Sequence, residues 1–160
     1  MKFLEGKHQM KRNFKSILGV TLLEIMLVLA IAAMIIVMSI RYYQSATNNQ
    51  QANTVLEAIQ AITAAADTLA QATGSYVQSN VSSSTIGSIV PTNTMTTPWG
   101  TAMTVTSATG TTYVVTLSQT PKTVCQLLNA RLAANNHYSG VTANACDATA
   151  DYTYTYISNP

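Results

Sequence analysis

A 21-residue apolar span near the N-terminus constrains this chain more than any other feature. Residues 20–40 read VTLLEIMLVLAIAAMIIVMSI, and Glu24 is the only charged residue among them. A helix of this length rises about 31 Å, which matches the hydrocarbon core of a bilayer. A carboxylate in hydrocarbon costs roughly 2.5 kcal/mol or more, so it usually marks a function or a partner. The span therefore predicts a membrane helix in which Glu24 needs an explanation.

The basic residues gather ahead of this span. Five of the eight Lys and Arg residues precede Gly19: Lys2, Lys7, Lys11, Arg12 and Lys15. Beyond Gly19 the chain has three basic and five acidic residues, a balance of 3 − 5 = −2. A basic flank beside an apolar span indicates a cytoplasmic N-terminus by the positive-inside rule. A nucleic-acid partner is not indicated, because that would need Lys and Arg clustered on a folded face.

The helical pattern continues past the span. No Pro or Gly interrupts residues 20–73, and Gly74 suits the C-terminal cap of a helix. Apolar residues recur at steps of four and three, at Val55, Ile59, Ile62, Ala66 and Leu69. The opposite face is polar, with Asn53, Glu57, Gln60, Thr63, Asp67 and Gln71. We expect one helix about 80 Å long, apolar all round in its first half and one-sided in its second.

The part of the chain after this helix predicts a connection and two paired strands. Residues 75–97 are rich in Ser, Thr and Asn, with room for a short helix or strand and with apolar anchors at Ile86, Ile89 and Val90. The TPWG turn at 97–100 precedes two strand-like segments, 101–107 and 111–118. The SATG sequence between them predicts a turn, in which Gly110 can take a positive φ.

The last forty residues predict a helix, a strand and a disulfide. Thr120 and Pro121 suit the N-cap and first position of a helix over 121–134. The tail DYTYTYIS predicts a final strand with one aromatic face, made of Tyr152, Tyr154 and Tyr156. The export-directed N-terminus favours one Cys125–Cys146 disulfide over two buried thiols. Its loop of about 20 residues would stabilise the fold by roughly 3 kcal/mol.

Residue types that carry catalysis or bind metals are not clustered in the sequence. His137 is the only histidine beyond the basic flank, and neither a GxSxG nor an HExxH motif is present. The cysteines lack metal-ligand spacing, and the sequence has no glycine-rich phosphate loop. Only Asp147 and Asp151 are acidic after Asp67, which gives a calcium site little support. We therefore expect no enzymatic activity, no cofactor and no metal site.

A cut between Gly19 and Val20 would explain Glu24. It would create an α-amino group four residues, about one helical turn, before the carboxylate. In an assembly of parallel helices, that ammonium could pair with Glu24 of a neighbouring copy. The pair would make docking and register a joint requirement. The alternative is that Glu24 lies near the lipid headgroups and stays solvated.

The residues around this bond resemble a known family. KSILG followed by VTLLEIMLVLAIAAMIIVMSI resembles the class III signal of type IV pilins and related pseudopilins. The resemblance implies that a prepilin peptidase/N-methyltransferase cleaves after Gly19 and methylates Val20, and that Glu24 guides assembly. It also implies the α+β pilin fold, in which a long helix packs on a C-terminal antiparallel sheet with a disulfide-bounded loop. About 55 residues carry the resemblance directly.

The resemblance implies an organisation in four parts: a basic leader (1–19), a transmembrane and filament-core helix (20–40), its amphipathic continuation (41–74) and a globular head (75–160). The expected partners are further copies in a helical homopolymer, the processing enzyme, the inner-membrane assembly machinery and, before assembly, the membrane. The precursor is expected in the inner membrane with its head in the periplasm. The assembled pilus is expected outside the cell.

Details favour the major subunit of a type IVb-like pilus. A long leader from Met1, a first mature residue other than Phe and the RYYQSA sequence resemble that branch, although Met10 offers a second start. TPWG is similar to a turn in type II secretion pseudopilins, so a pseudopilin or a minor pilin stays an alternative. So does a membrane-anchored periplasmic binding domain that never polymerises. A fourth alternative is a secreted protein cut after the A-x-A sequence at residues 30–32. The sequence does not distinguish adhesion from secretion as the role of a filament.

Overall fold

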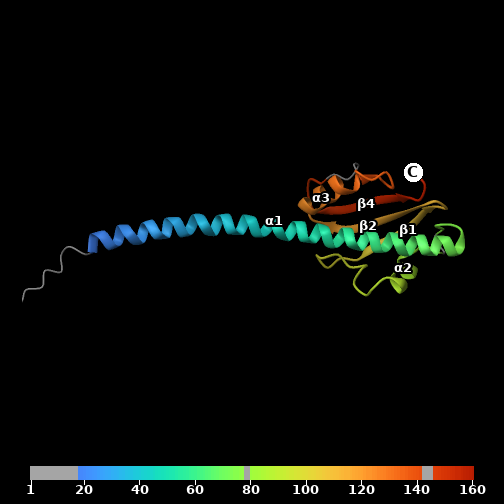
Figure 1. Ribbon diagram of the computed structural model, residues 1–160, viewed down its shortest axis with the longest axis horizontal. Helices are drawn as coiled ribbons and strands as arrows, with labels where there is room; N and C mark the ends of the chain where they lie inside the picture. The colour runs from blue at the N-terminus through green and yellow to red at the C-terminus, as the bar shows by residue number, and fades with distance from the viewer. Residues whose placement is uncertain (1–17, 78–79, 142–145) are drawn as a thin grey trace, which may run out of the picture. The chain divides into compact units, whose positions relative to one another are not determined.

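The computed structural model describes residues 18–77, 80–141 and 146–160. The chain divides into two compact units, with the boundary between Tyr43 and Gln44. The elements are α1 (Leu18–Thr73), α2 (Ser83–Ile89), β1 (Met103–Thr109), β2 (Thr112–Thr120), α3 (Lys122–Leu132), β3 (Tyr138–Ser139) and β4 (Ala150–Ile157) (Figure 1). This is the predicted α+β fold, a long N-terminal helix and an antiparallel sheet with a disulfide.

The uninterrupted helix is confirmed. α1 runs for 56 residues and ends where Gly74 takes a φ of 82°. The amide of Gly74 donates to the carbonyl of Ala70 at 2.6 Å, as expected of a glycine that closes a helix. The predicted stripe is buried at Val55, Ile59, Ile62 and Ala66, and partly buried at Leu69. The one-sided second half of the helix is therefore a core element of the globular unit.

The sheet has the strand order β1-β2-β4-β3, and every pair is antiparallel. The C-terminal strand β4 is therefore an inner strand, flanked by β2 and the two-residue β3. Figure 1 shows the second half of α1 lying along this sheet. The hydroxyl of Tyr113 on β2 donates to the Thr63 hydroxyl on α1 at 3.0 Å, which fixes the helix against the strands. The aromatic face of β4 is confirmed, since Tyr152, Tyr154 and Tyr156 are all buried.

Two details of the predicted turns are wrong. Gly110 does not take a positive φ, because β1 continues to Thr109 through a bulge after Ser107 and the turn shortens to two residues. Thr120 is not an N-cap: it is the fully buried last residue of β2, and its hydroxyl donates to the Leu117 carbonyl. Pro121 occupies the N-cap position of α3 instead, without a side-chain cap. A bulge ahead of Thr120 keeps it opposite Ala150, which extends the strand past its predicted end.

The Ser/Thr-rich connection contains the short helix α2. Ser82 caps it, because its side chain accepts from the amide of Thr85 and the Thr85 hydroxyl accepts from the amide of Ser82. Of the three predicted anchors, Ile86 is fully buried and Val90 is partly buried. Ile89 is 50 % exposed, so its assignment as an anchor is wrong. Of the two isoleucines on α2, therefore, only Ile86 faces the core.

Two buried tyrosines lead to a stability prediction. The hydroxyls of Tyr152 and Tyr154 are buried and have no hydrogen-bond partner among the residues that the structure describes. An unsatisfied buried hydroxyl costs about 1–3 kcal/mol. We therefore expect Tyr152→Phe and Tyr154→Phe each to raise the free energy of unfolding by about 1 kcal/mol. Denaturant unfolding of the full chain in detergent measures this change.

Tyr113→Phe is the matched control. It removes the donor to Thr63, so we expect it to lower the free energy of unfolding by about 1 kcal/mol. If all three substitutions destabilised the chain equally, the hydroxyls of Tyr152 and Tyr154 would have partners after all.

Candidate functional site

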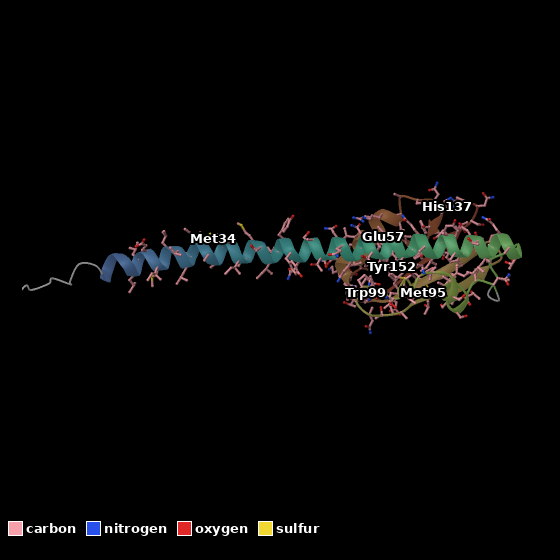
Figure 2. All side chains as sticks on the ribbon, turned by 60° about the horizontal axis from the view of Figure 1, so that its bottom comes forward. Met34, Glu57, Met95, Trp99, His137 and Tyr152 are labelled. Atoms are coloured by element: carbon pink, nitrogen blue, oxygen red, sulfur yellow. A yellow bond between two sulfur atoms is a disulfide. The ribbon has the colours of Figure 1, made fainter. Side chains whose placement is uncertain are left out.

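The first half of α1 forms an apolar surface that none of the described residues covers. The large apolar side chains from Leu22 to Ile40 are 52–72 % exposed. Figure 2 shows the side chains of this segment, with Met34 labelled, projecting from the helix all round. By length and composition the helix is able to cross a membrane. A surface of this size needs lipid or protein around it, because monomeric soluble proteins rarely expose such patches.

Two polar side chains interrupt the apolar surface between Leu22 and Ile40, and the structure treats them differently. The hydroxyl of Ser39 donates to the carbonyl of Ile35 at 2.8 Å, so the helix itself satisfies it. Glu24 is exposed and has no hydrogen-bond or ion-pair partner within the described part of the chain. A carboxylate offers about four acceptor positions. Glu24 is therefore the polar group of this surface that no described residue of the chain satisfies.

The predicted cleavage site lies at the start of α1. The backbone of Gly19 and Val20 belongs to the first turn of the helix, and Glu24 follows Val20 after about 6 Å of helical rise. The rest of the predicted leader, residues 1–17, lies outside the described residues. Cleavage and methylation stay predictions. The helical geometry places a new amino group at Val20 and the Glu24 carboxylate about one turn apart.

The apolar surface ends in a cation and two aromatic residues. Arg41 follows Ile40 directly, and the next residues, Tyr42 and Tyr43, are 79 % and 72 % exposed. Tyrosine rings are frequent at the boundary between hydrocarbon and water. Arg41 also borders a shallow hollow on this surface, together with Ala33, Met34, Val37 and Met38. Such a hollow can accept an apolar side chain of a packed helix.

The predicted disulfide is confirmed in the globular unit. Cys125 on α3 is bonded to Cys146 in the segment before β4, with 5.6 Å between the Cα atoms. The bond ties the short helix to the approach of the inner strand. Bonds of this kind persist in oxidising compartments such as the periplasm.

His137 and Asp67 of the globular unit contact groups of their own chain. The Nδ1 atom of His137 lies 2.8 Å from the Ile157 carbonyl, and its ring stacks on Tyr156 at 5.6 Å. The Tyr76 hydroxyl donates to Asp67 at 2.5 Å; burial and this contact raise the pKa of Tyr76 well above its usual range. Within the described residues no cluster of His, Cys, Asp or Glu could hold a metal ion.

Sequence reasoning missed one feature of the globular unit. Glu57, expected only as part of the polar face of α1, borders a cavity of about 370 Å³. The cavity forms between α1 and the segment around Asn93 and Thr96, which lies nearly 40 residues later in the chain. No periodicity in the sequence signals such a contact, because it depends on how the loop folds back onto the helix.

Comparison with protein-family models, with curated proteins and with solved structures finds no match for this chain. Its long apolar helix, antiparallel sheet and disulfide are compatible with a pilin-like protein.

Proposed function

We propose that this chain is the major structural subunit of a type IV pilus. The observation that carries the proposal is Glu24, a carboxylate on an exposed apolar helix, about one turn from Val20 and without a partner among the residues that the structure describes. Membrane anchoring alone accounts for the apolar residues but does not explain the carboxylate. Pairing with the amino group of a processed neighbour explains why a carboxylate stands at this position.

The precursor is held in the inner membrane by the apolar half of α1, with the globular unit in the periplasm. The processing enzyme removes the leader after Gly19 and methylates Val20. The subunit then joins the growing filament, where its ammonium pairs with Glu24 of a neighbouring copy. Both charges are satisfied only when neighbours dock at one axial offset, so the pair sets the register.

Close packing supplies the remaining specificity. Moving an apolar helix from lipid into a bundle of helices changes its apolar exposure little, so packing and charge pairing decide the geometry. The small residues of the span permit close approach: Ala30, Ala32, Ala33 and Ser39. The intrahelical hydrogen bond of Ser39 removes the cost of placing its hydroxyl in such a contact.

Mass spectrometry of protein sheared from cells tests the proposal. We expect filaments whose subunit begins at Val20 and carries one additional methyl group, with the Cys125–Cys146 disulfide intact. A terminus at Met1 or Met10 on a membrane protein that is absent from the sheared fraction would indicate a non-polymerising anchored domain. A terminus near Ala33 would indicate a secreted protein. Either result would overturn the proposal.

A further inference from the structure

The cavity beside Glu57 has the chemistry of a site for a cation. It is lined by Thr54, Glu57, Ala58, Ala61, Thr92, Asn93, Thr94, Thr96, Pro98 and Met103, and we call it the Glu57 cavity. Its volume of about 370 Å³ is at the lower end of the range of ligand sites, roughly 300–1,000 Å³. Glu57 is its only charged residue, and the other polar groups are hydroxyls and one amide. A carboxylate among neutral acceptors suits a hydrogen-bonding cation.

The walls of the Glu57 cavity are fixed by internal hydrogen bonds. The amide of Thr96 donates to the Asn93 carbonyl at 3.1 Å, and the amide of Met103 donates to the Met95 carbonyl at 2.8 Å. The Thr54 hydroxyl donates to the Gln50 carbonyl at 3.1 Å, which leaves its lone pairs free to accept. Glu57 itself has no hydrogen-bond or ion-pair partner among the residues placed by the structure. The cavity is therefore formed before anything occupies it.

Arg41 is the cation with the greatest need of a partner. It adjoins the apolar surface that packs between copies in the proposed filament, and no described residue pairs with it. A guanidinium cannot lose its proton in a protein, so its desolvation must be offset by an anion and by further acceptors. Arg41 and Lys122 are both exposed in the single chain, but Lys122, at the start of α3, does not adjoin the apolar surface. Arg131 already donates to Asn53 of its own chain.

The anions can be compared in the same way. Glu24 is assigned to the ammonium of Val20, Asp67 accepts from Tyr76, and Asp151 accepts from the amide of Gln119. Asp147 lies in the segment before β4, outside the Glu57 cavity. Glu57 remains, and it lies on the same helix that forms the contacts between copies in the proposed filament (Figure 2).

We propose that the Glu57 cavity receives Arg41 of a second copy of this chain. The guanidinium forms a two-pronged ion pair with Glu57, and its remaining N–H groups donate to the hydroxyl and amide oxygens of the cavity. This contact rests on the proposed function, because it operates only in a polymer. It adds a second fixed point between copies, on the globular unit rather than at the N-terminus.

Charge reversal with rescue tests the contact. We expect Arg41→Glu and Glu57→Arg each to reduce sheared filament protein at least about tenfold, since each leaves a packed charge unpaired. The double variant Arg41→Glu/Glu57→Arg is expected to restore most of the yield. Lys122→Glu is the matched control. Alone it is expected to leave the yield unchanged, and in combination with Glu57→Arg it is expected not to restore the yield. For each variant, a measured subunit mass that corresponds to a chain starting at Val20 shows that the variant is inserted and processed normally.

Cysteine cross-linking gives an independent reading if a reversed pair packs poorly. The variant Arg41→Cys/Glu57→Cys is expected to give a ladder of disulfide-linked multimers, and Lys122→Cys/Glu57→Cys is not. Three results would overturn the contact: normal yield from Arg41→Glu, rescue of Glu57→Arg by Lys122→Glu, or failure of both the double charge reversal and the cross-linking. If wild-type filaments form with Val20 processed, these results leave the proposed function intact. Absence of wild-type filaments would overturn the proposed function and the contact with it.

Discussion

Replacing Glu24 with Ala is expected to abolish filaments while leaving a folded, membrane-inserted subunit. Glu24 makes no hydrogen bond or ion pair with the described residues and lies outside the globular unit, so its loss removes nothing from the globular core. In the proposed filament the change would leave the Val20 ammonium of a neighbour without its anion. Removing one partner of a buried ion pair costs about 3–5 kcal/mol, which corresponds to a loss of at least about 100-fold in affinity per contact.

Yield of sheared filaments, compared with subunit in the membrane fraction, measures this effect. Glu24→Gln keeps the shape of the side chain and removes its charge, so it is expected to fail as Ala does. Ser39→Ala is the matched control in the same span, because the Ser39 hydroxyl bonds only within its own helix, and it is expected to assemble normally. Normal filaments from Glu24→Gln would show that the carboxylate charge has no part in assembly.

Local patterns in the sequence predicted the main elements of the fold. The stripe from Val55 to Ala66 identified the buried side of α1, because helical periodicity depends only on residues a few positions apart. The alternation from Tyr152 to Tyr156 identified the final strand and its buried face for the same reason. The disulfide followed from the presence of two cysteines in an export-directed chain.

The errors lie where distant residues decide the local structure. Thr120 has the residue type of an N-cap, but pairing with Ala150 on β4 keeps it in the strand. The two-residue β3 forms because Tyr138 and Ser139 meet Tyr156 and Thr155, and its own sequence is too short to predict a strand. Tertiary contacts overrode a local preference in both cases.

The same contrast between local patterns and contacts of distant residues applies to the candidate site. Gly19, Val20 and Glu24 could be identified from the sequence because their relation is a spacing within one helix. Their roles in processing and assembly stay predictions. The Glu57 cavity could not be identified, since it joins α1 to a loop that follows the next helix, α2.

Three tyrosines in the core set the response of the globular unit to alkali. Tyr113, Tyr152 and Tyr154 are fully buried, and burial raises the pKa of each phenol well above its usual value of about 10. The neutral phenol is therefore the form that the folded state favours. Below about pH 10 both states are protonated, and these tyrosines contribute their full stability. Above about pH 10 the unfolded chain releases protons that the folded chain retains, so the free energy of unfolding falls as pH rises.

The expected fall is about 1.4 kcal/mol per pH unit for each tyrosine, or about 4 kcal/mol for the three together. A globular unit of ordinary stability, roughly 5–10 kcal/mol, then unfolds between about pH 11 and 12.5. Near-ultraviolet circular dichroism of the full chain in detergent, combined with tyrosinate absorbance, follows unfolding and ionisation in one titration. We expect the two signals of the buried tyrosines to change together.

Two variants separate the buried tyrosines from the exposed ones. Tyr152→Phe/Tyr154→Phe removes two of the three fully buried phenols, so it is expected to reduce the slope and to move the transition to higher pH. Tyr42→Phe is the control, because Tyr42 is 79 % exposed, and it is expected to leave the transition unchanged. The packing of the β4 aromatic face requires this coupling of ionisation to unfolding. Ionisation of Tyr113, Tyr152 and Tyr154 near pH 10 with the dichroism intact would contradict it, because water would then reach these phenols in the folded state.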